Sequence, residues 1–64
     1  MLINGEQKSL EGEISVGDFL ARESYDPLRV AVEKNGNIVP KSAYDSEMLC
    51  DGDKIEIVCF VGGG

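Results

Sequence analysis

Short blocks of alternating apolar and polar residues run along the chain, and they predict strands joined by tight turns. The first block, residues 1–3 (MLI), is apolar and is followed by Asn4-Gly5, a dipeptide favoured in two-residue hairpin turns. We therefore expect residues 7–10 to return as a second strand. The N-terminal region predicts a β-hairpin.

The pattern changes to helical spacing in the next segment, residues 14–24 (ISVGDFLARES). Ser15 is a good N-cap, and Asp18 three residues later gives a pattern that resembles a capping box. Pro27 disfavours helical geometry at Asp26, so we expect the helical region to close there. One face of the predicted helix is apolar and is formed by Val16, Phe19 and Leu20.

A second hairpin is predicted from residue 29 to residue 41 (RVAVEKNGNIVPK). Val30 and Val32 share one face of its first strand, the period of two that is typical of a half-buried strand. Asn35-Gly36 predicts the turn. Residues 38–39 then form a brief return strand, which Pro40 ends or confines to a sheet edge.

The remaining residues predict an irregular stretch followed by a final strand. Residues 41–49 are mostly polar and have room for one helical turn. Residues 51–53 (DGD) predict a turn, and residues 54–61 (KIEIVCFV) form the longest predicted strand. The predicted order is therefore two strands, one helix, two strands, an irregular stretch and a last strand.

This order of elements predicts an α+β fold. The helix cannot bury its apolar face alone, so it must pack on the sheet. One main helix on a mixed sheet of four to five strands is the β-grasp, or ubiquitin-like, arrangement. A ferredoxin-like fold would need a second helix of comparable length, which residues 41–49 do not provide. We expect one domain over residues 1–61 and a flexible glycine tail over residues 62–64.

The two faces of the last strand predict a docking surface. Its odd-numbered positions, which include Cys59 and Val61, should face the helix, so Val58 and Phe60 should lie on the outer face. Exposed aromatic and aliphatic side chains at a strand end are typical of protein-docking patches. We expect Val58 and Phe60, with Val61 beside them, to dock a partner. The competing interpretation is that loops cover these side chains.

The charge and the composition argue against several classes of function. Twelve acidic against six basic residues give a formal charge of −6, which opposes nucleic-acid binding and suits a partner with a basic face. No run of eighteen apolar residues predicts a membrane span, and the first residues lack the pattern of a secretory signal. These features favour a cytoplasmic protein.

The reactive residue types do not suggest an enzyme. The chain has no histidine, and no serine or cysteine has an obvious activating neighbour, so we predict no catalytic residue. Cys50 and Cys59 are interpreted as buried thiols in a reducing compartment. They and nearby carboxylates are too few for a zinc site, so neither a metal nor a cofactor is expected.

The sequence finishes on Gly62, Gly63 and Gly64 directly after the last predicted strand. Three extended residues reach roughly 10 Å, and a backbone without Cβ atoms can pass through a channel too narrow for other residues. We therefore expect the glycines to enter a partner's active site and to present the carboxylate of Gly64 there.

A β-grasp of this size with a terminal diglycine resembles the sulfur-carrier proteins, and in detail the ThiS family of thiamine-biosynthesis carriers. The matching positions lie along most of the chain. They are Asn4-Gly5, Ser15-Val16, Phe19-Leu20, Asn35 through Lys41, Tyr44, Asp51 to Asp53 and Val61 to Gly64.

The resemblance implies a mechanism. An E1-like (ThiF-like) adenylating enzyme, using its own ATP and magnesium, would convert the Gly64 carboxylate into an acyl-adenylate. A persulfide donor would then supply sulfur to give a thiocarboxylate, which would pass its sulfur to a thiazole synthase (ThiG-like). The chain would be a carrier and cosubstrate.

Three alternatives stay open at this point. A molybdopterin-synthase small subunit uses the same tail chemistry on another acceptor, although such proteins tend to be longer. A ubiquitin-like modifier would be joined to lysines through Gly64. A non-covalent interaction module would carry the glycines incidentally.

Overall fold

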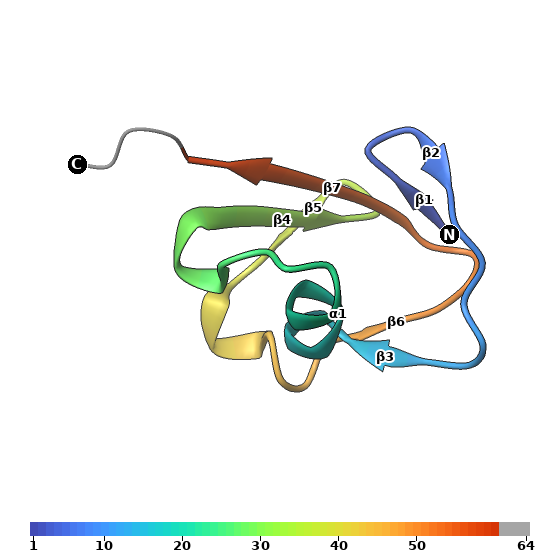
Figure 1. Ribbon diagram of the computed structural model, residues 1–64, viewed down its shortest axis with the longest axis horizontal. Coiled ribbons are helices and arrows are strands. Elements are labelled where there is room, and N and C mark those ends of the chain that lie inside the picture. The colour runs from blue at the N-terminus through green and yellow to red at the C-terminus, as the bar shows by residue number, and fades with distance from the viewer. Residues whose placement is uncertain (61–64) are drawn as a thin grey trace.

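The computed structural model describes residues 1–60. The sheet and the single α-helix follow the predicted order, with further short elements between them (Figure 1). The strands are β1 (Leu2–Ile3), β2 (Glu6–Gln7), β3 (Ile14–Ser15), β4 (Val30–Lys34), β5 (Asn37–Val39), β6 (Met48–Leu49) and β7 (Lys54–Cys59). The α-helix is α1 (Val16–Arg22), and 3₁₀ helices cover Pro27–Arg29 and Lys41–Ala43.

The main sheet has five strands in the order β2-β1-β7-β4-β5. Strands β1 and β7 are parallel, whereas β7 with β4, β4 with β5 and β1 with β2 are antiparallel. Helix α1 packs under one face of this sheet, and β3 pairs with β6 in a second, two-stranded sheet. One helix on a mixed sheet confirms the β-grasp prediction.

Both predicted hairpin turns are present, and both use backbone conformations that suit their residues. Asn4 and Gly5 have φ values of 48° and 85°, and Asn35 and Gly36 have 52° and 87°. Asparagine and glycine tolerate this left-handed region better than other residues. The first return strand is shorter and earlier than predicted, because β2 comprises Glu6–Gln7 rather than residues 7–10.

The helix begins where the sequence predicts. Ser15 is extended and its Oγ accepts a hydrogen bond from the Asp18 backbone N–H at 3.1 Å. This bond satisfies one of the unpaired N–H groups of the first turn. The predicted apolar face of α1 is fully buried in the core. The core comprises Met1, Val16, Phe19, Leu20, Val30, Val32, Val39, Tyr44, Leu49, Ile55 and Ile57.

The sequence did not predict the β3–β6 pair or the 3₁₀ helix at Pro27–Arg29. Ile14 lies opposite Leu49 and Ser15 opposite Met48, so the stretch described as irregular contributes a strand. A two-residue strand is too short to produce an alternating pattern. The helical turn expected between residues 41 and 49 is present as the 3₁₀ helix Lys41–Ala43.

Two predictions about the thiols were wrong. Cys59 was expected on the helix face of the last strand and buried, but it is exposed. Ile55 and Ile57 are 1% and 6% exposed, whereas β7 continues past α1 before it reaches Cys59 (Figure 1). Cys50 was also expected to be buried and is exposed, because it lies at the start of the surface turn around Gly52.

Candidate functional site

The outer face of the sheet carries the exposed side chains of the last strand. Val58 is 55% exposed and Phe60 is 57% exposed, so loops do not cover them. Val58 lies opposite Ala31 of β4, and the Phe60 N–H donates to the Arg29 carbonyl at 2.7 Å. The ladder with β4 therefore holds Val58 and Phe60 up to the last described residue.

Strand β5 adds a third apolar side chain to this face. Ile38 lies opposite Glu33, which places it on the outer face with Val58, and it is 66% exposed. Phe60 and Ile38 both line a shallow depression of about 200 Å³ between β4, β5 and the Pro40 segment. We call Ile38, Val58 and Phe60 the outer patch. Ile38 was not predicted as part of this surface, although the alternation of Asn37, Ile38 and Val39 in the sequence indicates it.

Two carboxylates stand beside the outer patch. Glu33 and Glu56 are directly opposite each other in the β4–β7 ladder, and both side chains lie on the outer face. Like charges in such a pair destabilise a sheet slightly. Within residues 1–60, neither glutamate forms an ion pair. The pair gives the patch a negative rim, which suits a partner with a basic docking face.

The side chain of Asn4 continues the hydrogen bonding on the β1 side of β7 past the end of β1. Its Nδ2 donates to the Ile57 carbonyl at 3.2 Å, and its Oδ1 accepts from the Ile57 N–H at 2.7 Å. The amide thus pairs with Ile57 as a strand residue would. Asn4 therefore forms part of the hairpin turn and also holds the last strand in position.

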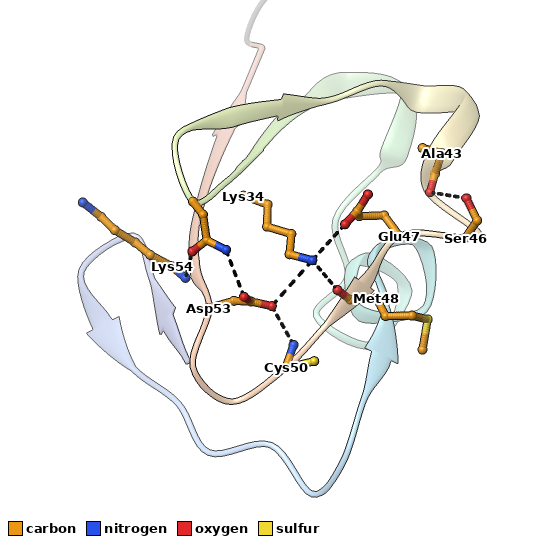
Figure 2. A network of polar contacts seen from close by, with 9 residues as sticks. Lys34, Ala43, Ser46, Glu47, Met48, Cys50, Asp53 and Lys54 are labelled. Carbon is orange, nitrogen blue, oxygen red and sulfur yellow. Dashed lines mark hydrogen bonds and ion pairs between the residues drawn. The ribbon is translucent and has the colours of Figure 1, made fainter.

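A polar cluster fixes the start of β7 against the β4–β5 turn (Figure 2). The Lys34 Nζ donates to Glu47 Oε2 and to the Met48 carbonyl, each at 2.8 Å, and lies 3.8 Å from Asp53 Oδ2. The hydrogen bond with Glu47, followed by the charge of Asp53, raises the pKa of Lys34. The lysine joins β4 to the segment before β7.

Asp53 completes this cluster on the other side of the lysine. Its Oδ1 accepts from Asn35 Nδ2 at 3.0 Å, and its Oδ2 accepts from the Cys50 N–H at 2.8 Å. The Asn35 Oδ1 in turn accepts from the Lys54 N–H at 2.9 Å. The hydrogen bond from Asn35 is the main reason that the pKa of Asp53 lies below its usual value.

The sequence that forms this fold matches the model of a known family along the whole chain. The model of the ThiS family matches residues 1–64. The chain belongs to the ThiS family. The resemblance inferred from the sequence is therefore confirmed.

Individual members and relatives agree with this assignment. The sulfur carrier protein ThiS of Bacillus subtilis is 46% identical over 50 residues, which are 78% of this chain and 76% of that protein. The crystal structure of the thiamine biosynthesis protein ThiS from Geobacter metallireducens superimposes with a TM-score of 0.80. It is 32% identical and the match covers 98% of this chain and 96% of that one.

Longer proteins also contain a stretch similar to this ThiS-family chain. A thiazole synthase of Paramagnetospirillum magneticum is 45% identical over 64 residues, all of this chain. A thiazole synthase of Magnetococcus marinus is 36% identical over 62 residues. The chain spans 20% and 19% of the lengths of these two proteins.

The structure describes some of the predicted site residues of this ThiS-family chain, and the others lie outside the described residues. Val58 and Phe60 lie together on the outer face as predicted. Val61 and the glycines 62–64 lie outside the described residues, as does the predicted domain boundary after residue 61. Among residues 1–60, no group of three or more Cys, Asp or Glu side chains is arranged to hold a metal ion.

No helix formed by residues 1–60 is long and apolar enough to cross a bilayer.

Proposed function

We propose that this chain is a sulfur carrier in thiamine biosynthesis and that it carries sulfur as a thiocarboxylate on Gly64. The observation that supports this most strongly is the full-length match to the ThiS family together with the similarity to a protein named sulfur carrier protein ThiS. The proposal places the protein in the cytoplasm, as a cosubstrate of other enzymes with no catalytic residue or cofactor of its own.

The carboxylate of Gly64 is a poor acyl donor until it is activated. An E1-like adenylating enzyme transfers AMP from ATP to the Gly64 carboxylate and releases pyrophosphate, and the ATP and magnesium belong to that enzyme. The terminal sulfur of a persulfide then attacks the carbonyl carbon and AMP leaves, which gives an acyl disulfide. A thiol then attacks the sulfur on the donor's side of this acyl disulfide and releases the thiocarboxylate, which keeps the terminal sulfur of the persulfide. The donor's own sulfur is left in a disulfide with that thiol.

The acceptor of the sulfur is proposed to be a thiazole synthase. Two proteins named thiazole synthase contain a stretch similar to 100% and 97% of this chain, which supports a functional link between carrier and synthase. The thiocarboxylate sulfur is a strong nucleophile and would add to an electrophilic carbon of the thiazole precursor.

The outer patch is proposed to provide the affinity that the glycines lack. Ordering three residues in a channel costs roughly 1–2 kcal/mol of backbone entropy each. Docking through Val58, Phe60 and Ile38, with Val61 next to them, would offset this cost. The rim formed by Glu33 and Glu56 would favour an enzyme with a basic docking face.

The test is an incubation with the adenylating enzyme of the same organism, ATP, magnesium, a persulfide donor and a small-molecule thiol, followed by intact-mass spectrometry. We expect the mass increase of one oxygen exchanged for sulfur, which is located on Gly64 by fragmentation. The matched control is the chain with Gly64 deleted, which should show no increase. No mass change in the intact chain would refute the proposal, and conjugates with lysines would indicate a protein modifier instead.

A further inference from the structure

Within residues 1–60, strand β7 is paired on both sides at its start but on only one side at its end. Its hydrogen bonds to β4 come from even-numbered residues, since the Lys54 carbonyl accepts from the Asn35 N–H and the Phe60 N–H donates to the Arg29 carbonyl. Consecutive residues of a strand direct their N–H and C=O groups to opposite sides. The odd-numbered residues of β7 therefore direct theirs toward the side of β1.

Two of the three odd-numbered residues are satisfied on that side. The Ile55 carbonyl accepts from the Asn4 N–H at 2.9 Å. The N–H and C=O of Ile57 both bond to the Asn4 side chain. The chain then turns away through Gly5 into β2, and the β1–β2 hairpin lies beside only the first part of β7 (Figure 1).

Cys59 is the next residue whose backbone faces this side. No residue among 1–60 pairs with its N–H or C=O, and the residue is exposed. The space beside residues 58–60, in line with β1, is therefore an open sheet edge about 10 Å long.

This edge lacks three features that often protect edge strands. Proteins block open edges with proline, charged side chains or bulges. Residues 58–60 (VCF) contain neither proline nor charge, and their pairing with β4 shows no bulge. The outer edge of the same sheet on β5 is followed directly by Pro40, and the edge on β2 begins with Glu6. The open edge at Cys59 is thus suited to backbone pairing with another protein.

We propose that the adenylating enzyme adds an extended segment to this edge and pairs with the N–H and C=O of Cys59. The inference rests on the proposed function, since residues 61–64 continue directly from this point into that enzyme. A strand added here would lie in line with β1 and would set the direction in which the following glycines leave the sheet. Because the contact uses backbone groups, it specifies direction with little demand on the side chain at position 59.

The experiment compares Cys59→Pro with Cys59→Ala in the adenylation reaction, measured by ATP-dependent pyrophosphate exchange. Proline removes the N–H that faces the open edge and leaves the bonds to β4 intact, so both variants should have melting temperatures within a few degrees of each other. We expect the KM for the carrier to rise about five- to tenfold in Cys59→Pro, the effect of losing one backbone hydrogen bond, and to stay unchanged in Cys59→Ala.

The outcomes separate the inference from the proposed function. Equal KM values for the two variants, with the unaltered chain active, would overturn the inference alone. No exchange with the unaltered chain would overturn the proposed function and the inference with it. If Cys59→Pro unfolds, residues 50–64 are synthesised with an N-methylated Cys59 amide and ligated at Cys50. The comparison is then made with the same ligated chain that carries an unmodified amide.

Discussion

Phe60 and Phe19 form a matched pair, because they are the two phenylalanines of the chain and differ in burial. Phe60 is 57% exposed and Phe19 is 1% exposed. We predict that Phe60→Ala weakens binding to the adenylating enzyme with a small loss of stability, whereas Phe19→Ala severely destabilises the fold. The pair distinguishes a docking side chain from a core side chain with the same substitution.

The magnitudes follow from burial. Complete burial of a phenylalanine side chain contributes about 1.5–3 kcal/mol, so Phe60, with less than half of its surface covered, should contribute about 1 kcal/mol. In a domain of this size that loss lowers the melting temperature by about 4–8 °C. Phe19→Ala should cost about 3–5 kcal/mol, which is a large part of the roughly 3–10 kcal/mol that holds a chain of this length folded.

Two measurements check the prediction. Urea denaturation followed by circular dichroism gives the free energy of unfolding of each variant. Isothermal titration calorimetry with the adenylating enzyme gives the dissociation constant, which we expect to rise about thirtyfold in Phe60→Ala if this side chain is a central contact. Similar losses of stability in both variants would show that Phe60 belongs to the core. An unchanged dissociation constant would show that the outer patch does not dock this enzyme.

Two further predictions concern the polar contacts that hold β7. Asn4→Gly keeps the positive φ of the turn but loses both hydrogen bonds to Ile57, so the free energy of unfolding in urea should fall by about 1–3 kcal/mol; no change would refute a role for this amide. The pKa of Asp53 is lowered in the folded chain, first by the hydrogen bond from Asn35, so its contribution is present above the unfolded pKa and is lost as the pH falls below about 4. Urea denaturation between pH 7 and pH 2 should show this decline, and Asp53→Asn should show a smaller one; an equal decline in both would contradict the assignment.

The local signals of the sequence were sufficient to predict most of the fold. Asn4-Gly5 and Asn35-Gly36 predicted both turns because few other residues adopt their backbone angles. The N-cap at Ser15 and the apolar face that includes Phe19 predicted the helix and its buried side. These features depend on residues near each other in the chain, so a single sequence reveals them.

The errors arose where distant segments meet. The β3–β6 pair joins two segments of two residues each, which carry no periodic pattern of their own. Cys59 continues the alternation of β7, and its exposure follows from where α1 stops covering the sheet. Ile38 joins the outer patch only because β5 lies in register with β4.

By itself, the sequence determined the order of elements, the buried face of each long element and the family, because turn residues, caps and periodicity act over a few positions. The tertiary structure alone decided which edge of β7 is open to a partner. It brought the side chain of Asn4 beside Ile57 and, within residues 1–60, left Cys59 without a neighbouring strand on the side of β1. Such pairing depends on where the β1–β2 hairpin ends in space, and no local pattern of residues encodes that position.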